Sequence, residues 1–412
     1  MHRPSLKAAV SALLLLLSGA ASAAAQANTG TANFSRYVAL GDSLTAGYMS
    51  NSLVRDVQLN SFPALIWRQA LGTATGFEQP LVSQPGIPPL LTLRGLLPTV
   101  ITPKSNTPGN PLNLNLPRPY NNLGVVGADA QDVVATVTGG FHDLVLRGQG
   151  TQLQQALALR PTFATVWVGN NDVLGAVLAG RVIDDVTLTT VARFEPAFRQ
   201  IVTSLNAAGA RLAIGNIPDV ASIPFVTTIP PVVVDPRTNL PVRIGGNLVP
   251  LVGVTPGQDF VLLSAAGLLG QGIGIPAALG GRGTPLPDEV VLSGAEVATI
   301  RARTAALNGI IQAAASQAGA AVMDLNTEFT EITQRGVTIG GVTYTTAFLT
   351  GGFFSYDGVH PTPFGYAFIA NLFIDAINTQ FGGEIPPVDL FPFMFGPEAS
   401  AGFVPSTAAS AQ

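Results

Sequence analysis

Short apolar runs alternate with longer amphipathic segments along most of this chain. Four of these runs carry few charges and are each followed by apolar positions at helical spacing; they cover residues 37–40, 164–168, 211–215 and 320–325. Repeated strand-then-helix order is typical of a parallel sheet, because each parallel connection needs a crossover segment that covers a sheet face. The pattern therefore predicts an α/β fold with helices on both faces of a central parallel sheet.

Two of the expected helices begin with caps that the sequence shows. Ser293 and Glu296 have the spacing of a capping box, and the apolar positions after them repeat at helical period until Gly319. Thr362 followed by Pro363 predicts an N-cap and the first residue of a last helix. These signals fix where both helices start.

Two long stretches break the alternation, at about residues 51–120 and 222–288. Both are rich in Pro and Gly, apolar and poor in charge, which predicts two ordered apolar insertions. Long loops of this kind are seldom idle surface, so a lid or substrate-facing wall is one interpretation and simple extension of the core is the other. We expect one domain over residues 34–383, with a strap and tail over 384–412.

The first residues have the pattern of a secretory signal peptide. Arg3 and Lys7 precede an apolar stretch over residues 8–17, and small residues with Ala-x-Ala spacing follow. The apolar stretch is shorter than the ~20 residues that a spanning helix needs. The sequence predicts cleavage of residues 1–25 and a secreted, periplasmic or extracellular protein, with an uncleaved anchor as the alternative.

Composition narrows the class of protein and of partner. Only 11% of the residues are charged and 47% are hydrophobic, which is too apolar for a disordered chain. Without the leader, 18 basic residues face 24 acidic ones, a net charge of about −6 that does not attract nucleic acid. With no cysteine and two histidines left, we expect no cofactor and no zinc or iron site, while an oxygen-only calcium site stays open.

Ser43 is the strongest candidate for a nucleophile. It follows the apolar run 37–40, where a strand breaks into a turn. A serine hydroxyl needs an imidazole base, and that base needs a third group that holds its ring in the right tautomer. Asp357 stands three residues before His360, close enough to fold back across a turn, and Pro361 keeps the histidine out of helical geometry.

His142 is the other histidine of the mature chain. Asp143 lies beside it, but adjacent residues in a strand or helix point apart. We therefore expect His142 to be a solvated surface residue without a part in turnover.

Donors for a developing oxyanion are predicted after two further runs. An asparagine in the segment 169–172 directly follows a predicted strand, at the edge where ligands bind in open α/β sheets. Gly127 ends a shorter apolar stretch, and without a side chain its N–H can approach a ligand closely.

In this order the four blocks, Gly41-Asp42-Ser43-Leu44, the segment ending in Gly127, Gly169-Asn170-Asn171-Asp172 and Asp357-x-x-His360, resemble the SGNH hydrolases, also called the GDSL esterase and lipase superfamily. The resemblance implies a three-layer α/β/α sandwich of the flavodoxin-like kind. It also implies a catalytic triad of Ser43, His360 and Asp357. The backbone N–H groups of Ser43 and Gly127 and the side chain of Asn171 would form the oxyanion hole.

The expected activity is hydrolysis of carboxylic acyl esters through an acyl-enzyme. The substrate would be a small-molecule or lipid ester, and transient contact with a lipid surface stays open, as do acyl-chain length and oligomeric state. A carbohydrate O-acetyl esterase or an acyltransferase of the same fold is the alternative, and a non-catalytic surface-binding protein is a third. Trp67 and Trp167 lie in apolar segments and are expected in the core rather than on a sugar-binding surface.

Overall fold

The structure is a computed structural model that describes residues 26–96 and 99–395. The predicted signal peptide, residues 1–25, lies outside the described residues, as does the end of the predicted tail. None of the described helices combines the length and the apolar character needed to cross a bilayer.

A four-stranded parallel sheet forms the centre of the molecule, in the order β1-β4-β5-β12. Its strands are β1 (Tyr37–Gly41), β4 (Phe163–Trp167), β5 (Arg211–Gly215) and β12 (Ala321–Met323). They coincide with the four apolar runs, so the predicted strands and their parallel arrangement are confirmed. Every residue of β1 and β4 is buried, as expected for strands covered on both faces.

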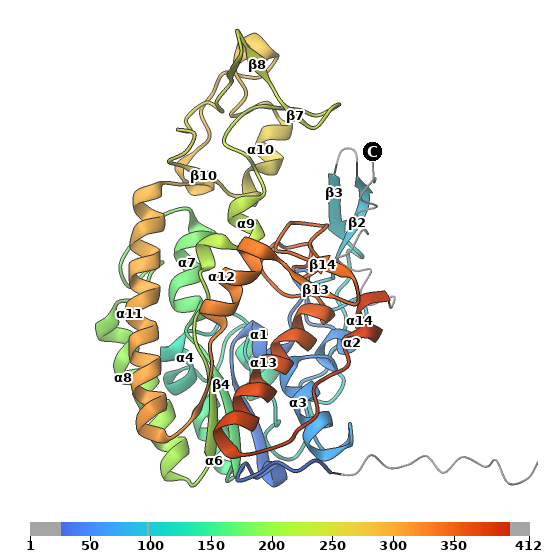
Figure 1. Cartoon of the computed structure of the whole chain (residues 1–412), viewed down its shortest axis with the longest axis vertical. Helices are drawn as coiled ribbons and strands as arrows, with labels where there is room; N and C mark the ends of the chain where they lie inside the picture. Colours follow the sequence, from blue (N-terminus) through green and yellow to red (C-terminus); the bar gives the residue numbers. More distant parts are fainter. Residues whose placement is uncertain (1–25, 97–98, 396–412) are drawn as a thin grey trace, which may run out of the picture.

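Helices cover the sheet on its two faces (Figure 1). On one face α3 (Phe62–Leu71) packs against α13 (Pro363–Phe381), which contacts β12 and β5. The other face carries four helices, α4 (Ala130–Ala135), α6 (Gln152–Ala158), α8 (Val191–Ala207) and α11 (Gly294–Ala318). The last three contact the sheet, and α4 packs against α6 and α8. The predicted three-layer α/β/α architecture is therefore confirmed.

Both predicted helix caps are present. Ser293 caps α11 in a complete capping box with Glu296, and the helix ends before Gly319, which is left-handed at φ 60°. The Thr362 hydroxyl accepts from the N–H of Gly365 at the start of α13. These caps satisfy N–H groups that a helix start leaves without intrahelical partners.

The first interrupting stretch divides into two parts. After the short helix α2 (Arg55–Gln58), α3 belongs to the main core, where Phe62 stacks on Phe373 with 4.7 Å between ring centroids. Farther along, β2 (Leu91–Leu96) and β3 (Thr99–Pro103) form an antiparallel hairpin that extends from the body (Figure 1).

The second interrupting stretch, between β5 and α11, forms a projection above the sheet (Figure 1). It has a small apolar cluster of its own, made of Val233, Leu251, Val254, Val261, Ala265, Leu286 and Val290. Its elements are α9 (Pro224–Thr227), β6 (Val234–Asp235), β7 (Leu240–Pro241), β8 (Arg243–Ile244), β9 (Asn247–Leu248), β10 (Phe260–Val261), α10 (Ala266–Gly270) and β11 (Val291–Leu292).

Shorter elements complete the body, several of them at the carboxyl edge of the sheet. They are the 3-10 turns Phe34–Arg36 and Val220–Ser222, α1 (Ser43–Ala46), α5 (Phe141–Leu146), α7 (Asn170–Ala179), α12 (Leu325–Arg335), the hairpin of β13 (Val337–Ile339) and β14 (Val342–Tyr344), and α14 (Phe391–Phe395).

Candidate active site

Ser43 lies at the carboxyl end of β1, as its place in the sequence predicts. Asp42 caps the short helix α1, with its Oδ1 accepting from the N–H of Leu44 at 2.9 Å. Ser43 is the first residue of that helix, where no intrahelical acceptor exists, and its N–H donates to no group among the described residues. Ser43 therefore places its hydroxyl and this N–H side by side at the carboxyl edge of the sheet.

The structure joins Ser43, His360 and Asp357 by hydrogen bonds. His360 Nε2 lies 2.9 Å from Ser43 Oγ, and His360 Nδ1 lies 2.9 Å from Asp357 Oδ2. When Nδ1–H donates to the carboxylate, Nε2 is left as the acceptor of the serine proton. Residues more than 300 positions apart thus form one chain of proton donors and acceptors.

Asp357 is held as a carboxylate by the groups around it. It accepts from the N–H groups of Asn51, Val359 and His360 at 2.8 to 2.9 Å. Burial alone would raise its pKa, but the adjacent His360 and these donors hold the pKa of Asp357 at about 2. The group therefore carries a negative charge that stabilises an imidazolium beside it.

Two tyrosines support the histidine, one directly and one through the other's carbonyl. Tyr48 packs edge-on against His360, with 4.8 Å between ring centroids and 68° between ring planes. The Tyr366 hydroxyl donates to the Tyr48 carbonyl from α13. Tyr48, Asn51 and Tyr366 carry no local sequence signal of a role in the site, because they act only through contacts between distant segments.

Asn171 and Gly127 are brought together by a pair of hydrogen bonds. Asn171 Nδ2 donates to the carbonyl of Ala128 at 2.9 Å, and the N–H of Ala130 donates to Asp172 Oδ2 at 3.0 Å. These contacts bind the start of α7 to the turn that contains Gly127. That turn follows a segment running parallel to β1, in which Val125 N–H donates to the Gly41 carbonyl.

Gly127 has the backbone that the turn requires. Its φ of 85° is left-handed, and no atom lies within 4 Å of the position that a side chain would occupy. Its N–H donates to no acceptor in the described part of the chain. Ser43 and Gly127 therefore each present an unused N–H, and Asn171 presents an amide in the cavity that Ser43 lines.

Two buried carboxylates fasten this edge together. Asp42 Oδ2 accepts from Asn170 Nδ2 at 2.8 Å, which links α1 to α7. Burial raises the pKa of Asp42 to about 6, and burial together with the nearby Asp129 raises the pKa of Asp172 to about 7. A sequence signal for this role existed, since both carboxylates flank a candidate catalytic residue.

The structure corrects the expectation for His142. Its side chain is half-buried on α5 rather than solvated, with Nδ1 3.2 Å from the Gly139 carbonyl and Nε2 buried without a described partner. Because α5 packs against the body through Phe141 and Val145, the helix carries His142 partly inward. It forms no described contact with Ser43 or Asp357.

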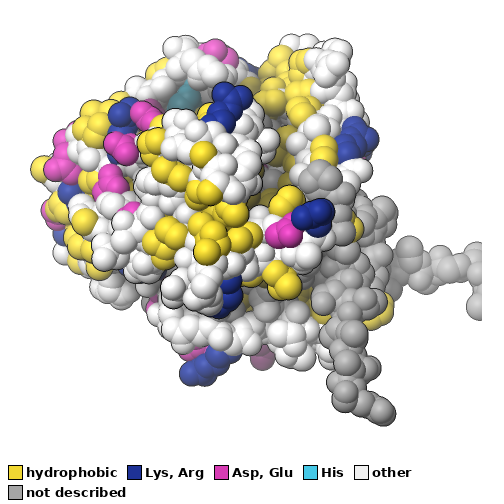
Figure 2. Space-filling view, turned by 90° about the horizontal axis from the view of Figure 1, so that it is seen from above, with side chains coloured by type: hydrophobic (Ala, Val, Ile, Leu, Met, Phe, Trp, Pro, Cys, Tyr) yellow, Lys and Arg dark blue, Asp and Glu magenta, His cyan; other side chains and the backbone are white. Residues whose placement is uncertain are grey.

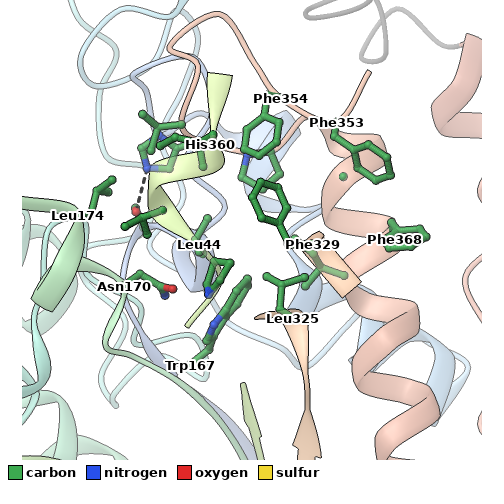
Figure 3. A pocket seen from close by; sticks show the side chains of 18 of the residues that line it. Leu44, Trp167, Asn170, Leu174, Leu325, Phe329, Phe353, Phe354, His360 and Phe368 are labelled. Carbon is green, nitrogen blue, oxygen red and sulfur yellow. Dashed lines mark hydrogen bonds between the residues drawn. The ribbon is translucent and has the colours of Figure 1, made fainter. Parts of the chain in front are cut away.

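A narrow apolar cavity leads away from Ser43 and His360 (Figure 3). Phe329 and Phe354 lie between His360 and the far end, where Phe353 and Phe368 are found. Trp167 forms part of the wall and is fully buried, and Trp67 is buried as well, which confirms the prediction that both tryptophans are core residues. The remaining wall is almost wholly aliphatic: Leu44, Leu174, Pro218, Val220, Ile223, Leu325, Ile332, Val359, Pro361 and Ile369.

No group of three or more His, Asp or Glu side chains is arranged to hold a metal ion within residues 26–96 and 99–395.

Comparison with known proteins assigns the family. Residues 37–373 match the model of the GDSL-like Lipase/Acylhydrolase family, which is most of the chain. The chain belongs to this family. The match covers all four blocks, and the family supports an esterase-type hydrolase that acts on acyl esters.

Solved structures similar to this member of the family have low sequence identity to it. They are TesA (12% identity, TM-score 0.33, 84% of this chain and 98% of that chain), the lipase/acylhydrolase from Enterococcus faecalis (15%, 0.35, 86% and 100%) and the extracellular lipase from Streptomyces rimosus (15%, 0.37, 84% and 98%). A search of curated proteins found no match.

Proposed function

We propose that this protein is a secreted serine esterase or lipase that cleaves carboxylic esters of apolar acyl chains, with Ser43, His360 and Asp357 as the catalytic triad. The observation that carries the proposal is the unbroken path from Asp357 through His360 to Ser43 at the mouth of an apolar cavity. The leader sequence supports secretion.

Acylation begins with the Ser43 hydroxyl. Its Oγ attacks the ester carbonyl carbon while His360 Nε2 takes the proton, and Asp357 stabilises the resulting imidazolium. The carbonyl oxygen becomes an oxyanion, for which the N–H groups of Ser43 and Gly127 and the Asn171 amide are the donors. When the carbonyl re-forms, the bond to the alcohol oxygen breaks and His360 gives its proton to that oxygen.

Deacylation repeats the sequence with water. His360 removes a proton from the water as its oxygen attacks the acyl carbon, and the same donors receive the second oxyanion. Collapse breaks the bond to Ser43 Oγ, which recovers a proton from His360, and the free acid leaves.

The cavity wall supports the choice of acyl esters over acetylated sugars. Burying apolar surface contributes about 0.8 kcal/mol for each CH₂ group, so a wall of Leu, Ile and Phe favours chains longer than acetate. Both tryptophans are buried, so neither offers the exposed platform that sugar sites often use.

The proposal is tested with p-nitrophenyl acetate, octanoate and palmitate alongside acetylxylan, and with a fluorophosphonate probe. We expect kcat/KM to rise from acetate to octanoate and the probe to form one adduct, at Ser43, identified by peptide mass mapping. Peak activity on acetylxylan would overturn the substrate class, and an unlabelled Ser43 in folded protein would overturn the mechanism.

Phe329→Ala sharpens the substrate test because Phe329 lies midway along the cavity. Removing its ring should raise the activity ratio of palmitate to octanoate. Phe391→Ala is the matched control, since Phe391 is 65% exposed on α14 and does not line the cavity. An identical chain-length profile in both variants would show that the acyl chain does not bind in this cavity.

A further inference from the structure

Two projections extend beyond the body at the same end of the molecule (Figure 1). One is the hairpin of β2 and β3, and the other is the tip of the second segment, where β6 pairs with β7 and β8 pairs with β9. We call them the apical hairpins, meaning residues 91–96 and 99–103 together with residues 234–248.

Large apolar side chains are exposed on the apical hairpins. Leu240, Ile244 and Leu248 are 64%, 59% and 42% exposed, and on the other hairpin Leu96 and Val100 are 50% and 40% exposed. Figure 2 looks onto this end and shows hydrophobic side chains gathered at the centre of the view, with Lys or Arg side chains among them. Contiguous exposed apolar side chains of this kind are typical of an interaction surface.

Basic side chains outnumber acidic ones in the apical hairpins, where Asp235 is the acidic residue in the sequence of these segments. Residues 236–258 contain Arg237 and Arg243 and no acidic residue, and residues 79–128 contain Arg94, Lys104 and Arg118 and none either. The whole chain nevertheless has a formal net charge of −4. The apical hairpins themselves contain Arg94, Arg237 and Arg243 against Asp235, so they have a net positive charge where the apolar side chains protrude.

These basic groups are largely free to meet an external anion. Arg237 lies 3.6 Å from Asp235, but its own side chain is 90% exposed. Within the described residues Arg94, Lys104 and Arg243 have no carboxylate partner, and their hydrogen bonds go to neutral oxygens of Lys104, Gln84 and Gly246 respectively. The exposed cations and apolar tips thus match the two layers of a lipid interface, anionic headgroups above acyl chains.

The backbone closes the tip as a paired hairpin. Arg243 pairs with Leu248 and Ile244 with Asn247 across a two-residue turn of Gly245 and Gly246, whose φ values are 58° and 83°. Such a turn suits the twist of a hairpin and needs residues that accept positive φ. Paired strands also satisfy backbone groups that would be costly to place at an apolar boundary.

The base of the second segment adjoins the catalytic turn. Phe225 N–H on α9 donates to the Gly358 carbonyl at 2.9 Å, one residue from Asp357. Val220 and Ile223, which directly precede α9, line the apolar cavity. A surface that holds the apical hairpins therefore lies at the end of the molecule where the cavity and the catalytic turn are found.

We propose that the apical hairpins dock the protein on a lipid surface that carries anionic headgroups. Docking itself is independent of the proposed activity, whereas delivery of a lipid ester to Ser43 rests on it.

The test is sedimentation of the full chain with vesicles of phosphatidylcholine alone and of equal parts phosphatidylcholine and phosphatidylglycerol. We expect binding to the mixed vesicles that weakens with added salt, because screening reduces attraction to the headgroups. Arg94→Gln with Arg243→Gln should weaken it by roughly tenfold or more, since each basic residue near an anionic surface contributes about fivefold. Leu240→Ser with Ile244→Ser and Leu248→Ser should abolish it.

Controls separate docking from catalysis and from folding. Leu178→Ser with Val186→Ser removes apolar residues that are 47% and 75% exposed elsewhere, and it should leave vesicle binding unchanged. All these variants should hydrolyse p-nitrophenyl butyrate in free solution at the parent rate, which shows that they are folded. An inactive parent that still binds the vesicles would count against the proposed function alone. Equal vesicle binding by the leucine and isoleucine variant, no binding by the parent, or dimerisation through the hairpins in ultracentrifugation would overturn the docking proposal.

Discussion

Two regions differ in which side chains they bury. One is the edge of the sheet around Ser43, and the other is the projection between β5 and α11. At the edge, polar side chains such as Asp42, Asn170 and Asp172 are buried and reach across segments to one another or to backbone groups. In the projection, a small apolar cluster supports a tip on which Leu240 and Ile244 face outward.

The difference shows how one chain places its catalytic groups in one region and an exposed apolar surface in another. Buried polar groups are costly unless they are bonded, so an edge that contains several of them has few alternative arrangements. The tip of the projection has a small cluster of its own and no described contact with the catalytic groups. We expect substitutions at the edge to affect chemistry and global stability, and substitutions in the projection to act locally.

Replacing the catalytic imidazole should have the largest effect. His360→Ala leaves Ser43 without a base, so kcat for p-nitrophenyl butyrate should fall by about 10⁴-fold or more. His142→Ala is the matched control and should retain nearly full activity, because His142 has no described contact with the triad. Comparable losses in the two variants would contradict the assignment of the base.

Truncating a side chain in the main core should lower global stability far more than truncating one in the projection. Phe373 is fully buried between Phe62 and Trp167, so Phe373→Ala should lower the free energy of unfolding by about 3–5 kcal/mol. Leu251→Ala, in the cluster of the projection, should speed amide hydrogen exchange within residues 224–292 and change the main unfolding transition little. A similar loss of global stability in both variants, measured by urea denaturation, would make the projection part of one cooperative unit.

Removing the side-chain oxyanion donor should slow the chemical step. Asn171→Ala should lower kcat by about 10²–10³-fold with KM little changed, because the amide is expected to act on the transition state. Asn206→Ala, an exposed amide on α8, is the control. An effect confined to KM would place Asn171 in substrate binding instead.

The buried carboxylates should give stability a pH dependence of defined sign. Because the pKa of Asp172 is raised to about 7 in the folded protein, the folded state binds an extra proton below that pH. Its contribution to the free energy of unfolding should therefore decrease by roughly 2 kcal/mol as pH rises from about 5 to 7. The carboxylate of Asp357, with its pKa lowered to about 2, stays ionised throughout this window.

Asp172→Asn tests that assignment by urea denaturation at several pH values. The variant should lose the part of the decrease that Asp172 contributes, since its amide keeps an acceptor for the Ala130 N–H without a charge to bury. The smaller part from Asp42, whose pKa is raised to about 6, should remain. Asp143→Asn, on the exposed side of α5, should keep the parent profile. An unchanged slope in Asp172→Asn would assign the pH dependence to another group.

The sequence by itself determined the four strands and their parallel direction. It also determined the caps of α11 and α13 and the residues from which a triad could be built. These features depend on local rules: apolar runs make buried strands, Ser-x-x-Glu and Thr-Pro start helices, and a scarcity of histidines leaves few bases to choose from. A local rule was not enough at His142. Packing of α5 against the body, which neighbouring residues in the sequence do not reveal, turned its side chain partly inward.

Only the tertiary structure decided the cavity and the bonds that hold the edge together. Phe329, Phe354 and Phe368 line one cavity with Ser43 through packing between α12, the loop after β14 and α13. Asn170 meets Asp42 across 128 positions of sequence. The same folding placed one part of the first interrupting stretch in the core as α3 and another part, β2 and β3, in the apical hairpins. Such contacts depend on which surfaces remain to be covered once the sheet has formed, and no periodicity within a single segment carries that information.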